Sequence, residues 1–250
     1  MSDATTPGVP LAAPLYKELV RQWRDALSAG EWKPGEAIPA ERRLADRWGV
    51  SIGTVRKAID ELVAANILIR QQGRGTFVAT HTRDRMLFYF FHVVPEDGTK
   101  VYPVVRLVSF GRGKADRTES EHLAIAPGDP VIRIRNVLEL SGEPIIVDDL
   151  VVSAARFPGL TERQFRERPS TIYNLYQDAF GVSVVRTRER LRARTADADV
   201  AALLRLSRGA PLLEIRRIAL GLADEPVELR LSRVNTARHE YYAELGDATA

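Results

Sequence analysis

The order of secondary-structure elements predicted between residues 14 and 80 constrains this chain more than any other feature. Apolar residues spaced three and four apart indicate a helix over 14–30 and another that begins near residue 51, with a shorter helix over 39–48 between them. Residues 67–70 and 76–80 are strand-like and flank a glycine-bearing turn, which is typical of a β-hairpin. Three helices and a hairpin in this order predict a small unit with its own core.

The third predicted helix has an apolar side and a polar N-terminal end. Ser51 is a natural N-cap for it. The core positions expected on the first and third helices are Leu15, Leu19, Trp23, Leu27, Val55, Ala58, Ile59, Leu62 and Val63. This pattern leaves a group of residues near the start of the third helix away from the core, namely Ile52, Gly53, Thr54, Arg56 and Lys57.

The order of elements is that of a winged helix-turn-helix, which explains a helix that presents polar residues to solvent. An α-helix about 10–12 Å across fits the major groove of B-DNA, and its N-terminal amides and dipole favour phosphate oxygens. The hairpin tip, Gly73-Arg74-Gly75, can bring one cation to an adjacent phosphate or into the minor groove. A capped helix with exposed cations also occurs in many soluble proteins. Residues 11–80 carry 11 Lys and Arg against 8 Asp and Glu, so affinity for DNA would depend on where the cations lie.

Four motifs follow one another in residues 15–78: the PGE turn, P-x-E-R-x-L-A, GVS-x-x-TVR-x-A and GRGTFV. With them the run resembles the N-terminal domain of the GntR family of bacterial transcription regulators. Two positions depart from the family pattern. Ile52 stands where members often carry a guanine-reading Arg and could instead touch a thymine methyl, and Arg43 stands where Glu is usual. The resemblance and the exposed positions together give the expected DNA-binding residues: Arg42, Arg43, Ser51, Ile52, Gly53, Thr54, Arg56, Lys57, Gly73, Arg74 and Gly75.

The remaining length predicts a second domain of the α+β class with a largely antiparallel sheet. Strand patterns are expected over 101–111, 130–140, 143–152, 182–194, 211–221 and 225–235. Helices are expected over 161–169, 170–181 and 197–206. The predicted organisation is a flexible tail over 1–10, the winged helix-turn-helix over 11–79, a coupling linker over 80–86 and the second domain over 87–247.

Several runs in the second part occur in the order of the UTRA effector domain, among them SGEPIIVDD, STIYNLY and RGAPLLEIRR. Residues 85–245 therefore resemble the effector-binding half of the HutC subfamily. The resemblance implies a fold like that of chorismate lyase, a bound small metabolite and homodimerisation through this domain. It also implies a ligand-controlled regulator of a double-stranded DNA operator, with repression as the default.

The effector site is expected to combine a few polar groups with an apolar lining. Arg133 and Arg135 share a strand face and could grip a carboxylate. Asn136 and Leu138 occupy the positions where phosphosugar-sensing relatives carry Arg, which favours a small organic acid. Adjacent strand residues face opposite sides, so Asp148 and Asp149 cannot share one ligand. The expected effector-binding residues are Arg133, Arg135, Asp148, Thr171, Tyr173, Glu228 and Arg230; a surface ion pair or a helix cap accounts for each of them equally well.

The alternative is a chorismate-lyase-type enzyme with an appended DNA-binding head. Against it, His81, His92, His122 and His239 share no metal-ligand spacing, and G-x-S-x-G is absent. GRGK at 111–114 lacks the phosphate-loop spacing and indicates a plain turn. The sequence predicts no catalytic residue, metal or cofactor. No apolar run reaches membrane-spanning length, the longest being strand-length at 86–91, and the absence of cysteine fits a cytoplasmic protein.

Overall fold

The structure is a computed structural model that describes residues 14–244, so the predicted tail over 1–10 lies outside the described residues. The chain divides into two compact units, one that ends at Ala79 and one that begins at Thr80. Among residues 14–244, no helix combines the length and the apolar character needed to span a lipid bilayer.

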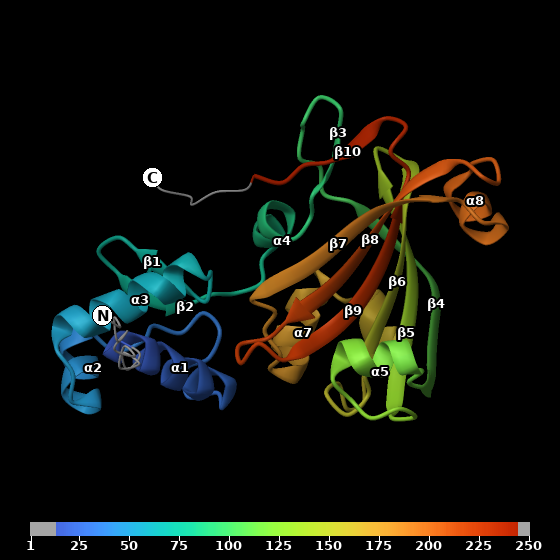
Figure 1. Cartoon of the computed structure of the whole chain (residues 1–250). Coiled ribbons are helices and arrows are strands. Elements are labelled where there is room, and N and C mark those ends of the chain that lie inside the picture. The colour runs from blue at the N-terminus through green and yellow to red at the C-terminus, as the bar shows by residue number, and fades with distance from the viewer. Residues whose placement is uncertain (1–13, 245–250) are drawn as a thin grey trace, which may run out of the picture. The chain divides into compact units, whose positions relative to one another are not determined.

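The first unit contains three helices and a hairpin (Figure 1). Its elements are α1 (Leu15–Ser28), α2 (Glu41–Trp48), α3 (Ile52–Ala64), β1 (Leu68–Gln71) and β2 (Gly75–Val78). Both α1 and α2 pack on α3, and Trp23, Leu44 and Leu62 are fully buried in this unit. Leu15 is 59% exposed and was wrongly expected in the core, because it is the first residue of α1 and lies a full turn before Leu19, which is buried.

The second unit is a six-stranded antiparallel sheet in the order β4-β5-β6-β9-β8-β7. The strands are β4 (Val104–Lys114), β5 (Pro130–Leu140), β6 (Glu143–Ser153), β7 (Arg186–Thr195), β8 (Pro211–Leu220) and β9 (Pro226–Val234). The sheet confirms the predicted α+β class. Residues 111–114 belong to β4 rather than to a turn, and the missing side chain of Gly113 leaves room for the guanidinium of Arg133 on the next strand.

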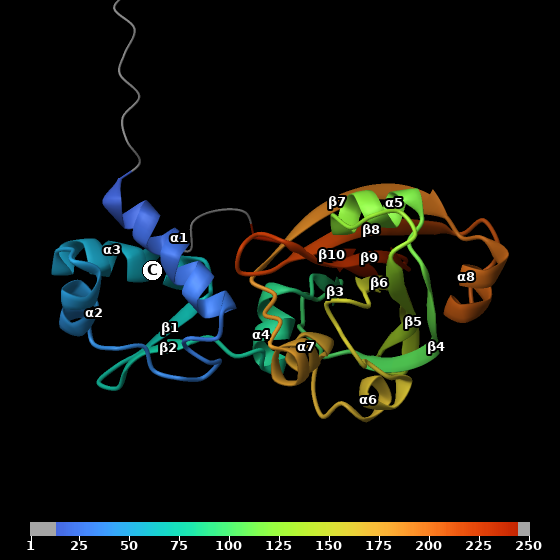
Figure 2. The same ribbon diagram turned by 90° about the horizontal axis from the view of Figure 1, so that it is seen from below.

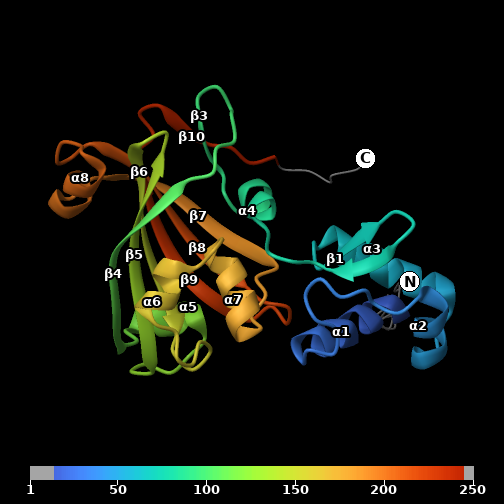
Figure 3. The ribbon, with the colours of Figure 1, turned by 180° about the vertical axis from the view of Figure 1, so that it is seen from behind.

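Helices lie on both faces of this sheet. They are α4 (Arg83–Tyr89), α5 (Arg117–Leu123), α6 (Glu162–Glu167), α7 (Ile172–Phe180) and α8 (Ala198–Leu204). We call the face that bears Ile134 and Leu150 the inner face; α6 and α7 pack against it (Figure 2, and from behind in Figure 3). The outer face bears Val137 and Val151, and α5 and α8 pack there. Helix α5 was not predicted, although Asp116 forms a capping box with the N3 glutamate of the helix.

The structure differs most from expectation in residues 80–91, where the sequence predicts a linker over 80–86 and a strand-length apolar run over 86–91. Thr82 caps α4 by accepting a hydrogen bond from the backbone N–H of Arg85 at 3.1 Å, so residues 83–89 are helical. His81 is buried in the second unit, where its backbone N–H donates to Gln177 Oε1 at 2.9 Å. The last residue of the first unit, Ala79, donates its own N–H to Ile67 O at 2.9 Å. Thr80 therefore lies between Ala79, whose N–H is bonded within the first unit, and His81, whose N–H is bonded within the second. The last two elements, β3 (Val93–Pro95) and β10 (His239–Tyr241), pair with each other and were not predicted.

Candidate DNA interface and effector pocket

The start of α3 is an exposed and well-capped helix terminus. The hydroxyl of Ser51 accepts a hydrogen bond from the Thr54 N–H at 3.1 Å, which confirms Ser51 as the N-cap. Gly49 ends α2 in the left-handed conformation that a tight turn into α3 requires (φ 62°). Ile52 and Gly53 are exposed in the first turn. A Cβ at Gly53 would meet only Ser51 Oγ, at an ordinary 3.7 Å, so nothing inside the protein requires glycine there.

Cations flank this helix terminus. Arg56 donates from Nε to Glu41 Oε2 of α2 at 2.7 Å, and its side chain remains 63% exposed. Arg42, Arg43 and Lys57 are exposed and form no ion pair with another residue of 14–244. The guanidinium carbon of Arg74, on the wing, lies 5.8 Å from the centre of the Phe77 ring. Positive φ at Gly73 (70°) and Gly75 (117°) gives the wing tip its sharp turn.

The eleven predicted DNA-binding residues thus lie in three exposed segments: the start of α2, the start of α3 and the β1–β2 turn. Such a surface offers amide dipoles, one exposed apolar side chain and several cations to a nucleic-acid backbone and its groove edges. Arginine at 42, 43, 56 and 74 can each contact a phosphate.

The seven predicted effector residues do not form one group, because the sheet separates them. Arg133 pairs with Glu119 at 2.6 Å, and Arg135 pairs with Asp149 and Asp199, all on the outer face. These two arginines are therefore held by carboxylates of the protein and lie on the other side of the sheet from the remaining five. The prediction that they share a site with Asp148 is wrong, since residues 133 and 135 alternate with the inner-facing residues of β5.

The inner face carries a buried polar cluster. Arg230 reaches Glu228 at 2.8 Å and Asp148 at 3.2 Å, and all three are nearly inaccessible. Ser232 donates to Asp148, and Tyr176 donates its hydroxyl to Glu228 at 2.9 Å. Burial opposes the charge of Arg230, but Glu228 and its other anionic neighbours raise the pKa of the guanidinium overall.

Aromatic hydroxyls complete this cluster. Tyr173 OH lies 3.5 Å from Glu228 Oε1, and burial followed by the Glu228 charge raises the pKa of Tyr173 to about 12. Burial likewise raises the pKa of Tyr176 well above its usual value. Both hydroxyls therefore stay protonated at neutral pH and act as donors to the carboxylate. Asp148 on this face and Asp149 on the other confirm that the adjacent acids point apart.

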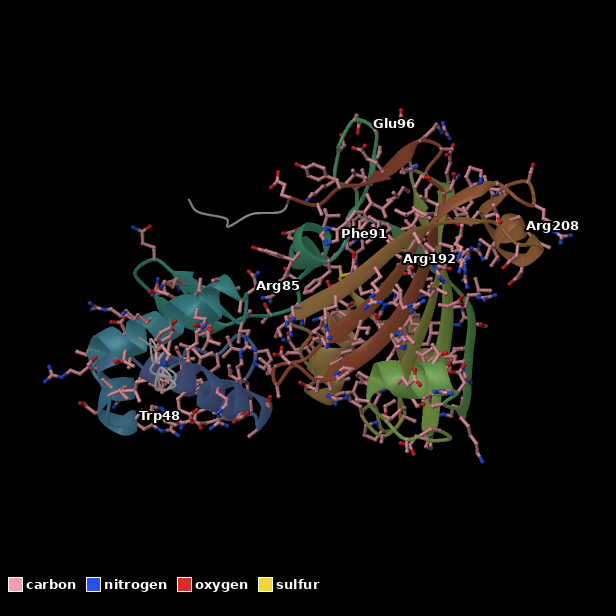
Figure 4. All side chains as sticks on the ribbon, viewed as in Figure 1. Trp48, Arg85, Phe91, Glu96, Arg192 and Arg208 are labelled. Atoms are coloured by element: carbon pink, nitrogen blue, oxygen red, sulfur yellow. The ribbon has the colours of Figure 1, made fainter. Side chains whose placement is uncertain are left out.

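A cavity of about 40 Å³ opens beside this cluster. Its walls are Asp148 and Arg230 on the sheet, Thr171 at the start of α7, and side chains that were not predicted, including Tyr102, Asn136 and Arg168. Phe91, which follows α4 beside the sheet, is one of its apolar lining residues (Figure 4).

Arg168 is the cation of this cavity that no carboxylate balances. It lies on the ring of Phe165 at 4.2 Å and donates to the Phe165 carbonyl, while its buried Nε has no partner. Burial, and to a lesser degree the positive charge of Arg230, lower the pKa of Arg168. Among residues 14–244 no acid pairs with it. Thr171, three residues on, caps α7 by accepting from the Asn174 N–H at 3.0 Å.

Two family models match this chain. Residues 15–78 match bacterial regulatory proteins of the gntR family, and residues 100–240 match the UTRA domain. The chain belongs to the GntR family of bacterial transcription regulators. It is a DNA-binding regulator rather than an enzyme, with a helix-turn-helix domain for operator DNA and a UTRA domain for a small-molecule effector.

Relatives of this GntR-family regulator are repressors by name. A Shigella flexneri protein named "Probable fructoselysine utilization operon transcriptional repressor" is 30% identical over 220 residues, covering 86% of this chain and 88% of the relative. The histidine utilization repressor of Pseudomonas putida is 28% identical over 206 residues, covering 82% of each. The crystal structure of a ligand-binding domain from Bordetella bronchiseptica, titled as GntR-family, is 30% identical with a TM-score of 0.60 and covers 64% of this chain and 99% of that one.

Five of the predicted effector residues lie at or beside this cavity. Asp148, Thr171 and Arg230 line it, and Tyr173 and Glu228 lie in the polar cluster next to it. Arg168 was missed, although it stands immediately before the Pro-Ser-Thr that starts α7. Asn136 was expected to matter only because it stands where phosphosugar-sensing relatives carry an arginine.

Proposed function

We propose that this regulator is a cytoplasmic, homodimeric repressor whose operator affinity falls when a small carboxylated metabolite binds in the inner-face cavity. Arg168 is the observation that carries the proposal. A half-buried guanidinium without a protein carboxylate is costly unless another anion accompanies it. The start of α7 adds the positive end of a helix to the same cavity.

The charge available favours a carboxylate over a phosphate ester. Arg168 supplies one unbalanced positive charge, which matches a carboxylate. A phosphate monoester carries about −1.5 to −2 charges near neutral pH and would call for further cations. At 136 and 138, where arginines could have met that need, the cavity presents an amide and a leucine.

Coupling to DNA requires that the effector bind two states of the protein with different affinity. A cavity of about 40 Å³ has to widen to hold a metabolite. The ligand would therefore bind more tightly to a state of the protein in which the residues lining the cavity have moved apart. Helix α7 supplies a route: Thr171 and Ile172 line the cavity, and Gln177 on the same helix accepts from His81 N–H. In the proposed dimer, two copies of α3 enter successive major grooves of a near-palindrome.

Thermal-shift screening of organic acids against hexose phosphates tests the effector class, and footprinting on the DNA upstream of the gene tests operator binding. We expect the acids to raise the melting temperature and to release the operator. Arg168→Gln should abolish the shift, whereas Arg163→Gln on exposed α6 should leave it intact. A shift with hexose phosphates alone would overturn the carboxylate assignment.

A further inference from the structure

We infer that the effector is a zwitterion of the amino-acid class, which carries an ammonium group as well as the carboxylate. This inference rests on the proposed function and adds a second recognition point to the same cavity. The added point is a pair of acceptors, Asn136 and Asp148, which line the same cavity as Arg168 and the start of α7.

Asn136 and Asp148 are direct cross-strand neighbours on the inner face, in the pairing of β5 with β6. Both line the cavity, at 4% and 2% exposure. Oδ1 of Asn136 is buried and has no hydrogen-bond partner. A buried acceptor without a donor destabilises the protein until a donor arrives, so this atom marks a place where a ligand N–H fits.

The charges behind this pair also favour a cation. Asp148 and Glu228 share the single guanidinium of Arg230. The next buried guanidinium, Arg217, is already paired with Glu189. Apart from Arg168 across the cavity lining, the cluster around Asp148 therefore holds one more carboxylate than guanidinium among residues 14–244, and the hydroxyls of Tyr176 and Ser232 offset the difference.

An ammonium group meets both needs at once. It has three N–H donors and one positive charge, enough for Asn136 Oδ1 and for a carboxylate oxygen of Asp148. A hydroxyl has one donor and no charge, so a hydroxy acid could satisfy only one of the two. The same cavity offers Arg168 to a carboxylate, and an α-amino acid carries both groups a few bonds apart.

The test compares ligands that share a carbon skeleton. The twenty common amino acids, their deaminated keto acids and hydroxy acids, and their decarboxylated amines are titrated into the full-length protein by calorimetry. We expect at least one amino acid to bind at least about tenfold more tightly than its deaminated acid and its amine, since buried polar groups reject an analogue that leaves them unpaired.

Variants show which residue produces the preference for the amino acid over its deaminated acid. Asn136→Leu should reduce the preference for the amino acid over its deaminated acid to about twofold or less, while Asn174→Leu, outside the cavity on α7, should keep it. Circular dichroism establishes that each variant is folded. If Asn136→Leu proves unfolded, Asn136→Asp provides the second arm, because an added carboxylate should keep or increase the preference.

The outcomes separate this inference from the proposed function. If a deaminated acid binds as well as its amino acid, the ammonium site is refuted and the carboxylate repressor stands. If amines bind and carboxylates do not, the Arg168 assignment fails as well. If no member of the panel binds while another organic acid does, the ammonium site is refuted and the carboxylate repressor stands; if no organic acid binds at all, both are overturned.

Discussion

Replacing Arg56 by Ala separates the contribution of this residue to DNA binding from its contribution to the fold. The Arg56–Glu41 pair is 63% and 35% exposed, and exposed pairs contribute about 0–1 kcal/mol to stability. A bidentate contact from an arginine to a base is worth about 1–3 kcal/mol. In a dimer the change occurs twice, so the loss should be about 2–6 kcal/mol, or roughly 30- to 20,000-fold in operator affinity.

Fluorescence anisotropy with a footprinted operator fragment, at several salt concentrations, measures this loss. If Arg56 contacts a phosphate, the slope of log affinity against log salt should also fall by about 0.9 per protomer. Arg21→Ala is the matched control, since Arg21 forms exposed ion pairs on α1 and belongs to no predicted interface.

Two results would refute the reasoning. An affinity within twofold of the parent protein would remove Arg56 from the interface. Loss of ligand-induced stabilisation together with DNA binding would contradict the division of labour between the two units, because Arg56 belongs wholly to the first.

Three further perturbations test other parts of the structure. Gly53→Ala should stabilise α3 by about 0.5–1 kcal/mol yet weaken operator binding, as followed by urea unfolding and gel shift; unchanged binding would show that the backbone does not approach DNA there. His81 is held neutral because burial lowers its pKa to about 3, whereas the unfolded residue titrates near 6.5. The free energy of unfolding should therefore fall as pH drops from about 6.5 toward 3. His81→Gln should reduce the slope of this free energy against pH by the equivalent of up to about one bound proton. Equal slopes in the parent protein and the variant would contradict this. Inserting Gly-Ser-Gly after Ala79 should preserve effector binding and abolish the effect of ligand on operator affinity, and a retained response would place the coupling elsewhere.

The sequence was most informative where structure is decided locally. The α1–β2 succession and the Ser51 cap follow from short-range patterns, and alternation along β6 was enough to separate Asp148 from Asp149. Alternation could not tell which face of the sheet would carry the cavity beside Asp148. Helices α6 and α7 decide this, because they cover Ile134 and leave Arg135 on the opposite side.

The remaining misses have a similar cause. Arg168 lies between two helices, in a stretch without periodicity, and its importance depends on the distant strands that complete the cavity. The apolar run 86–91 has strand composition, yet the cap at Thr82 and packing of Phe90 against the inner-face cluster make most of it helical. Tertiary packing overrode local preference there.

The N–H groups of Ala79 and His81 are both anchored, and the backbone torsions of Ala79 and Thr80 between them form a hinge. Helix α3 has 13 residues and is about 20 Å long. A 20° rotation about this hinge would carry any point that lies 20 Å from it through roughly 7 Å, about a fifth of the ~34 Å between successive major-groove half-sites. A modest torsional adjustment at two residues is thus geometrically sufficient to take a recognition helix out of phase with its site.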